Sequence, residues 1–319
     1  MAGSTKRYAV VTGANRGIGL GVVKRLASEG IIVVLTARDE KKGLEAVEKL
    51  KEFGHIVFHQ LDVTDPASVS SLTDFIKSQF GKLDILVNNA ASGGIKLLGD
   101  PPKSRVPDEV EVNNAATSGD ALPSDVPKNA ISEDIPEISQ IDWTQILETY
   151  DLAGDCIETN YYGPKRMIEA LIPLLLLSDL PRIVNVSSIG GKLGYITNKR
   201  ALELLSDVET LTEDRVEDVL REFRKDFKDG LLEINCWPCK PSSYKISKAA
   251  LNAYTRIMAK KYPTFCVNCV CPGPVKTETS FHSGTRTPEE GAEGLVKLAL
   301  LPKGGPSGLF FTEKGVSTF

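Results

Sequence analysis

Two kinds of hydrophobic pattern alternate over the first ninety residues, and this alternation constrains the fold more than any other feature. Segments with helical spacing alternate with short β-rich runs at residues 8–12, 31–36, 56–61 and 83–87. Parallel strands joined by right-handed helical crossovers produce this order of elements. Residues 31–35 are all apolar, which is typical of a strand that is covered on both faces. We therefore predict an α/β fold with a doubly wound parallel sheet.

Charge and composition exclude several classes of protein. The 319 residues include 38 Lys and Arg against 42 Asp and Glu, for a net charge of −4. This balance disfavours sequence-independent binding of nucleic acid, which needs a basic surface. The longest apolar runs, at 31–35 and 174–177, are far shorter than the roughly 20 residues of a membrane span. We expect a cytoplasmic protein without a signal peptide, whose six cysteines stay reduced.

Two stretches interrupt the rhythm of strands and helices. Residues 92–142 are rich in proline and lack periodicity, and residues 189–235 contain an amphipathic helix that begins after the N-cap Thr212 and ends at Gly230. Between them we expect a long helix at about 143–177 with interruptions at Gly163-Pro164 and Pro173, and a strand at 182–186. A helix at 243–261, a strand at 265–271 and a helix at 288–300 complete the layout. We interpret residues 1–319 as one domain with two insertions.

A glycine-rich loop joins the first strand to the first helix. Glycines allow a tight turn and close approach of the backbone to a pyrophosphate, and the N-terminus of the following helix attracts that anion. The position between a strand and a helix favours a dinucleotide site over a purely structural turn. The residues expected to hold the cofactor here are Gly13, Asn15, Arg16, Gly17, Ile18 and Gly19.

The end of the second strand favours NADP(H) over NAD(H). An NAD site usually has an acidic residue there that bonds the ribose 2′-hydroxyl, whereas this chain has Ala37 followed by Arg38. The forked guanidinium of Arg38 suits a 2′-phosphate, and Lys42 and Arg16 could add positive charge. The alternative is that these side chains are ordinary solvated charges.

A Tyr and a Lys lie four residues apart, at Tyr244 and Lys248, and therefore on one face of a helix. A ketone that accepts a hydride needs a proton, which a tyrosine can donate. We expect the ammonium of Lys248 to lower the phenol pKa toward the working pH. The strand at 183–186, which is followed by Ser187-Ser188, supports a catalytic role for this pair.

With these motifs the chain resembles the short-chain dehydrogenase/reductase family, whose members have a Rossmann-type sheet. The spacing Gly-x-x-x-Gly-x-Gly, the pair Asp62-Val63 and the run Asn88-Asn89-Ala90 carry the resemblance, although Ala91 replaces a family glycine. The resemblance implies that Asp62 and Val63 contact adenine and that Asn89 lies beside the cofactor. It also implies that Val275 and Thr277, in the loop after the strand at 265–271, meet the nicotinamide carboxamide.

The same resemblance assigns the catalytic roles. It implies that Ser188 bonds the substrate oxygen, that Ser187 has a backbone role, and that Tyr244 and Lys248 also contact the cofactor. It further implies that the main-chain carbonyl of Asn160 holds a water that relays protons to Lys248. Pro164 has no N–H group to bond that carbonyl, which gives a local reason to expect it free.

Both insertions narrow the resemblance to the plant branch of salutaridine, menthone and neomenthol reductases. It implies that residues 92–142 form a flap over the substrate, and that the helix with the stripe from Val216 to Phe227 covers the face that other members use to dimerise. We therefore expect a monomer, with the charged side chains of this helix facing water. The candidate substrate residues, besides Ser188, are Ile95, Leu97, Trp237 and Phe281.

The leading interpretation is an NADPH-dependent carbonyl reductase that acts on the ketone of an apolar terpenoid or alkaloid. The alternatives are a ketoreductase of 4-keto-6-deoxy sugars and a non-catalytic NADP-sensing protein; C=C reduction is disfavoured by Tyr244. We expect no metal. A regulatory thiol pair at Cys236 and Cys239 is left open, whereas Cys266, Cys269 and Cys271 are expected to fill apolar space on one face of a strand.

Overall fold

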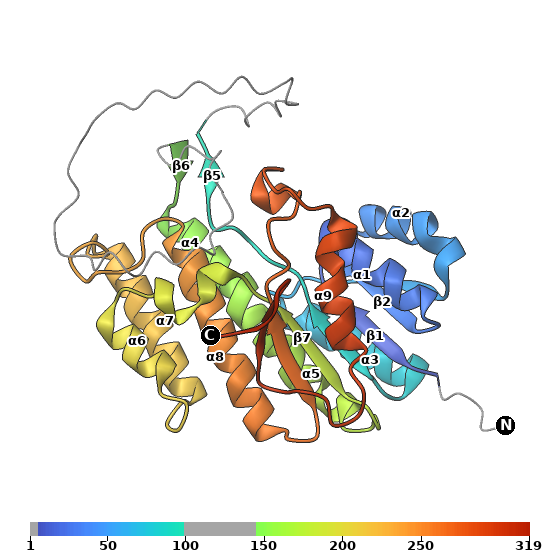
Figure 1. The fold of residues 1–319 in the computed structure, drawn as a ribbon. Coiled ribbons are helices and arrows are strands. Elements are labelled where there is room, and N and C mark those ends of the chain that lie inside the picture. Colours follow the sequence, from blue (N-terminus) through green and yellow to red (C-terminus); the bar gives the residue numbers. More distant parts are fainter. Residues whose placement is uncertain (1–5, 99–144) are drawn as a thin grey trace.

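A computed structural model describes residues 6–98 and 145–319. Its centre is an eight-stranded sheet, which lies between the helices in Figure 1. The strand order is β10-β9-β8-β7-β4-β1-β2-β3, and all neighbours are parallel except β9 and β10. The predicted parallel sheet is confirmed. The strands are β1 (Tyr8–Val11), β2 (Ile32–Ala37), β3 (Ile56–Gln60), β4 (Ile85–Asn88), β7 (Arg182–Val186), β8 (Cys266–Val270), β9 (Phe310–Thr312) and β10 (Gly315–Ser317).

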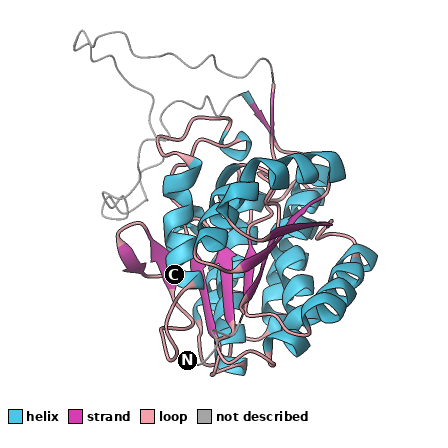
Figure 2. Cartoon of the chain, turned by 90° about the vertical axis from the view of Figure 1, so that its right-hand side faces the viewer, coloured by secondary structure: helices cyan, strands magenta, loops and turns pink. Residues whose placement is uncertain are grey.

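Helices cover both faces of this sheet, as Figure 2 shows. Because side chains alternate along a strand, Val10 belongs to one core and its neighbours Ala9 and Val11 belong to the other. The first core includes side chains of α3, α5 and α8, and the second includes side chains of α1 and α9. The helices of these layers are α1 (Gly17–Ser28), α2 (Glu40–Leu50) with the 3₁₀ turn Lys51–Phe53, α3 (Pro66–Phe80), α5 (Gly163–Leu175), α8 (Ser242–Lys261) and α9 (Pro288–Ala299).

The long helix expected at 143–177 has different bounds. Residue 143 lies outside the described residues, and the helix begins with α4 (Tyr150–Ile157), capped by the Thr149 hydroxyl. It then passes through a π-helical segment, Glu158–Tyr162, directly into α5. The break predicted at Gly163-Pro164 was wrong, because the helix continues through both residues; the π-helical segment ends directly before them, so the backbone pairing changes next to the proline, which has no N–H group. Pro173 lies inside α5, two residues before its end.

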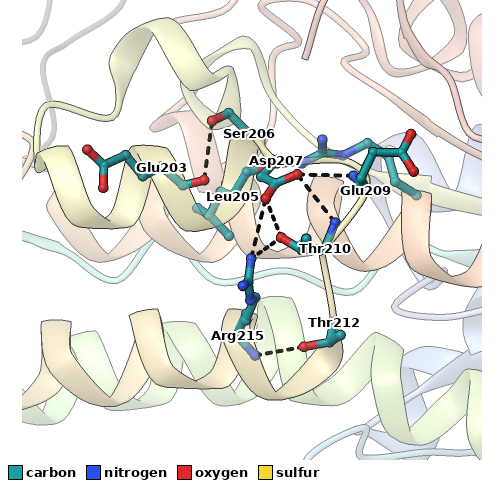
Figure 3. Close-up of polar contacts among 9 residues, drawn as sticks. Glu203, Leu205, Ser206, Asp207, Glu209, Thr210, Thr212 and Arg215 are labelled. Carbon is teal, nitrogen blue, oxygen red and sulfur yellow. Dashed lines mark hydrogen bonds and ion pairs between the residues drawn. The ribbon is translucent and has the colours of Figure 1, made fainter.

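The second insertion is largely helical. It contains the short turns Ile189–Gly191 and Leu193–Tyr195, then α6 (Lys199–Ser206) and α7 (Glu213–Lys228), which is capped by Thr212 as predicted. The corner between α6 and α7 is held by Asp207, whose carboxylate accepts hydrogen bonds from the backbone N–H groups of Glu209 and Thr210 at 3.2 and 3.3 Å and pairs with Arg215 (Figure 3).

The buried face of α7 packs against the body of the protein. Val216, Val219, Leu220 and Phe223 are buried, as the stripe predicted. The expectation that all charged side chains of this helix face water was wrong for Asp226, which is only 5% exposed. Its carboxylate accepts hydrogen bonds from Trp237 Nε1 and Asn235 Nδ2, both at 2.7 Å. A buried charge is tolerated where such donors satisfy it.

A second, two-stranded sheet lies at the roots of the first insertion. It pairs β5 (Lys96–Leu97) with β6 (Ile146–Leu147) in antiparallel register (Figure 1). The flap predicted for residues 92–142 lies outside the described residues from residue 99 onward. No helix in the ranges 6–98 and 145–319 is both long and apolar enough to cross a membrane.

Candidate active site

A cavity of about 2040 Å³ runs along the carboxyl ends of the central parallel strands. This is where ligands bind in open α/β sheets, at the point where the strand order reverses, here between β1 and β4. Three predicted site residues do not line it: Gly19, Asn160 and Leu97. The predicted residues that line it are Gly13, Asn15, Arg16, Gly17, Ile18, Arg38, Lys42, Asp62, Val63, Asn89, Ile95, Ser188, Trp237, Tyr244, Lys248, Val275, Thr277 and Phe281.

The glycine-rich loop lies against the end of β4. Gly13 has a φ of +60°, and a Cβ atom on it would lie 2.9 Å from Ala90 Cα. Asn89 Nδ2 donates hydrogen bonds to the carbonyls of Thr12 and Gly13, at 2.9 and 3.0 Å, and a Cβ on Gly19 would lie 2.5 Å from this nitrogen. Gly19 therefore leaves room for Asn89 to hold the loop, which is a positioning role that the sequence alone did not indicate.

The start of α1 is suited to a pyrophosphate. Its N-cap residue, Arg16, makes no side-chain cap, and its first turn carries no acidic residue. The free N–H groups and the positive end of the helix dipole are therefore directed at the cavity. Arg16 itself forms an ion pair with Glu278 on the opposite wall. The loop thus fits the phosphates of a dinucleotide, while Arg16 also joins the two walls.

The end of β2 presents unneutralised positive charge. Arg38 is exposed, and within the described ranges it forms no ion pair. The nearby carboxylate of Asp39 caps α2 by accepting a hydrogen bond from the Lys42 N–H at 3.0 Å, and lies 3.8 Å from Lys42 Nζ. Because Asp39 is used by the helix, Arg38 remains available for a 2′-phosphate.

The predicted proton donor and its lysine lie on the first two turns of α8. Tyr244 is the third residue of this helix, and Lys248 Nζ lies 5.6 Å from the centroid of the Tyr244 ring. Lys248 is 2% exposed, and its Nζ donates a 2.8 Å hydrogen bond to the carbonyl of Val186 at the end of β7. The end of β7 therefore fixes the lysine beside the tyrosine, as the spacing predicted.

Burial dominates the titration of this pair. Burial raises the pKa of Tyr244 above its ordinary value, although a hydrogen bond with Ser188 opposes the rise. The expected lowering of this pKa toward the working pH is not found, because burial raises it and Lys248 is not among the groups that shift it. Burial also lowers the pKa of Lys248 to about 8. At neutral pH the tyrosine is thus a neutral phenol that can donate a proton, beside a lysine that is mostly charged.

The two serines after β7 have different partners. Ser187 is buried; its N–H donates to the carbonyl of Val270 at 2.8 Å, and its hydroxyl donates to Asn252 Oδ1 at 2.6 Å. Ser188 lines the cavity, where its hydroxyl accepts a 3.1 Å hydrogen bond from the Gly190 N–H. The hydroxyl of Ser188 can still donate toward an oxygen in the cavity.

Asn160 is fully buried in the π-helical segment. Its Oδ1 accepts from the Ser92 N–H at 2.8 Å, and its Nδ2 donates to the Ser92 carbonyl at 2.9 Å and to Ser247 Oγ at 3.0 Å. The side chain thus connects the segment after β4 to α8. The water-binding role of its main-chain carbonyl stays a prediction.

The substrate end mixes apolar and polar walls. Trp237 is 5% exposed, whereas Leu97 lies in β5 away from the cavity lining. Phe281 has a φ of +50°, which is rare for a bulky residue. Residues with such strained backbones cluster at functional sites. Polar lining residues that the sequence did not single out include Glu148, Asp155, Tyr195, Glu233 and Lys240. They come from separate segments, so no local pattern could group them.

The cysteines do not form a metal centre in the part of the chain that the structure describes, where no group of three or more His, Cys, Asp or Glu side chains could hold an ion. Cys269 and Cys271 share one small core cluster, but Cys266 lies apart from it and contacts the Gly305 carbonyl. The prediction that all three cysteines share one face of the strand was wrong, because residues three apart on a strand point to opposite faces. Cys236 and Cys239 are exposed and free.

Comparison with known proteins gives consistent matches. A family model described as short chain dehydrogenase matches residues 7–119. The chain is 51% identical to salutaridine reductase of Papaver bracteatum, over 98% of this chain and 96% of that protein. It is also 51% identical to (+)-neomenthol dehydrogenase of Arabidopsis thaliana, over 100% of both. The solved structure of salutaridine reductase from Papaver somniferum superposes with a TM-score of 0.84 at 50% identity, covering 97% of this chain and 100% of that one.

Proposed function

The chain belongs to the short-chain dehydrogenase/reductase family, and from this premise we propose that it is an NADPH-dependent carbonyl reductase acting on the ketone of an apolar plant metabolite of the terpenoid or alkaloid type. One observation carries the proposal: a single cavity connects the free N-terminus of α1 and the cation of Arg38 with Ser188 and Tyr244. The relatives named as salutaridine reductase and neomenthol dehydrogenase support the substrate class.

The cofactor would be held by residues at one end of the cavity. The N–H groups at the start of α1 would bind the pyrophosphate, Arg38 and Lys42 the 2′-phosphate, and Asp62 with Val63 the adenine. Val275 and Thr277 would lie beside the nicotinamide, which supplies a hydride when bound. We also propose that Lys248, beside Tyr244, contacts the ribose.

The reduction would be completed by the chain's own groups. The Ser188 hydroxyl donates a hydrogen bond to the ketone oxygen and holds it near Tyr244. The phenol of Tyr244, kept neutral by burial, donates its proton to that oxygen as negative charge develops on it. Lys248, fixed by the Val186 carbonyl, stabilises the phenolate that is left. Asn160 would complete the proton supply through a water on its main-chain carbonyl.

The proposal is tested by following NADPH absorbance with cyclic ketones of the menthone type. Wild-type protein should consume NADPH, and Tyr244→Phe should lower kcat by about 10²-fold or more, since general acid catalysis contributes about 10²–10⁴-fold. Arg38→Ala should lower the preference for NADPH over NADH, whereas the exposed neighbour Lys41→Ala should not. Full turnover by Tyr244→Phe would contradict the mechanism, and NADPH binding without turnover of any ketone would favour a sensing protein.

A keto sugar is a second candidate substrate, because Glu233, Lys240 and Tyr195 give the substrate end polar groups that could bond hydroxyls. A higher kcat/KM for a 4-keto-6-deoxy sugar than for apolar ketones would select it. Leu97, which lies off the cavity lining, is not part of either proposed pocket.

We also propose that the protein is a monomer, because α7 packs over α8 and α4, where other family members are expected to dimerise. Sedimentation at several concentrations tests the oligomeric state: a concentration-independent mass near 34.6 kDa is expected. A stable dimer would contradict the proposal.

A further inference from the structure

Glu148 makes a concentrated set of contacts with the start of the catalytic helix. It lies directly after β6 and lines the cavity. One carboxylate oxygen, Oε1, accepts hydrogen bonds from the N–H and hydroxyl of Ser243, at 2.8 and 2.6 Å. The other, Oε2, accepts from the N–H and hydroxyl of Ser242, both at 3.1 Å. One side chain thus satisfies two backbone and two hydroxyl donors.

These contacts replace a cap that the local sequence does not supply. The N-cap residue of α8 is Pro241, which has no side-chain acceptor, and the first N–H groups of a helix have no partner within the helix. Ser242 and Ser243 are buried, 2% and 0% exposed, so water cannot easily take over. A carboxylate at this end also interacts favourably with the helix dipole.

The next residue along the helix is Tyr244. The direction of its phenol depends on the conformation of the first turn of α8, because Tyr244 belongs to that turn. No cap within the local sequence fixes this turn. The turn is also confined from another side: a Cβ on Gly94, which has a φ of +68°, would lie 2.6 Å from Ser243 Oγ. Gly94 thus leaves room for the Ser243 hydroxyl, which contacts the Cys156 thiol as well as Glu148.

We propose that Glu148 is a positioning residue that orients Tyr244 for proton transfer by capping the catalytic helix from a distant segment. The inference rests on the proposed ketone reduction. This role differs from substrate binding, because the carboxylate of Glu148 already accepts hydrogen bonds from four donors of α8. A geometric error of about 1 Å can cost about 10²-fold in rate, so the first turn is a place where small shifts affect kcat.

The test compares Glu148→Gln with Asp207→Asn. In Gln, the NH₂ group cannot accept from a backbone N–H, so one of the two bonds to the backbone is lost. Asp207 is the matched control, because its carboxylate also accepts from backbone N–H groups and a hydroxyl, but at the α6–α7 corner and not in the cavity lining (Figure 3). Ser243→Ala, which keeps the backbone bond to Glu148 and removes the 2.6 Å hydroxyl contact together with a contact to the Cys156 thiol, is the milder variant if Glu148→Gln does not fold.

The expected result for Glu148→Gln is a kcat lower by roughly tenfold or more, an NADPH Kd within about twofold of wild type, and a larger solvent isotope effect on kcat as proton transfer becomes slower. Amide exchange at residues 242–245 should accelerate in this variant and not in Asp207→Asn. Ser243→Ala should show the same changes, smaller in size.

Two outcomes overturn the inference. If Glu148→Gln lowers the melting temperature but leaves kcat and the isotope effect unchanged, the contact is only structural. If KM for the ketone rises while kcat and exchange stay unchanged, Glu148 contacts substrate instead. A wild-type protein that reduces no ketone refutes the proposed function itself, and amide exchange then still shows whether Glu148 caps the helix.

Discussion

The buried carboxylate of Asp226 offers the sharpest test of how α7 is attached. We predict that Asp226→Ala destabilises the protein, because the buried Trp237 N–H, now 2.7 Å from the carboxylate, would have no acceptor. A buried donor without a partner costs about 1–3 kcal/mol, and a hydrogen bond to a charged group is worth about 1.5–3 kcal/mol. Asn235 is half-buried and can turn to water. We therefore expect a loss of about 2–4 kcal/mol.

Asp218→Ala is the matched control on the same helix. Asp218 accepts a 2.7 Å hydrogen bond from Arg221, but the two side chains are 43% and 74% exposed. Such surface pairs contribute about 0–1 kcal/mol. Both substitutions place alanine in one helix, so the gain in helix propensity cancels when the two variants are compared.

Urea unfolding of the two variants gives the measurement. The free energy of unfolding should be lower for Asp226→Ala than for Asp218→Ala by about 2 kcal/mol or more. Because Trp237 lines the cavity, KM for the ketone should also rise in Asp226→Ala while NADPH affinity stays unchanged. Equal stabilities of the two variants would refute the argument that this buried acceptor holds the tryptophan.

Two further predictions concern the cofactor end and the buried lysine. Gly19→Ala should weaken NADPH binding by about tenfold or more (~1.4 kcal/mol), because the added Cβ would lie 2.5 Å from Asn89 Nδ2. Calorimetry measures this affinity. The control Gly194→Ala should bind NADPH as the wild type does, because a Cβ there meets open space. Burial lowers the pKa of Lys248 from 10.5 to about 8, so the unfolded chain binds more protons between these values and stability gains from rising pH. Lys248→Met should lack this gain, seen as the difference between the two unfolding curves from pH 8 to pH 10; parallel curves would contradict the shift.

Local patterns predicted the parts of the molecule that are themselves local. The first four strands, the glycine-rich loop and the Tyr244–Lys248 spacing each lie within a few residues, so the sequence displays them directly. The three-residue strands β9 and β10 were missed, because such short runs carry no clear alternation. The π-helical segment was also missed, since Gly163 and Pro164 directly after it resembled a helix stop.

Contacts between distant segments were beyond the reach of these patterns. The amphipathic pattern of α7 correctly predicted that Val216 and Phe223 are buried. It also predicted that every acidic side chain of this helix faces water, because the pattern does not show that the fold brings Trp237 to Asp226. Glu148 stands in no motif, and its partners lie more than ninety residues away. The titration of Tyr244 was predicted from its neighbour Lys248 alone, whereas burial by the whole fold decides it.

The π-helical segment Glu158–Tyr162 limits how the length of this chain can change. Asn160 inside it bonds Ser92 and Ser247, while Met167 and Leu171 on α5 fill the core. A π-helical turn holds one residue more than an α-helix over the same path. Deleting one of its residues would let α-helical hydrogen bonds continue from α4 into α5, so the apolar face of α5 would keep its place. Asn160 would then be moved away from Ser92 and Ser247, and a one-residue deletion here should therefore preserve the core while breaking these contacts.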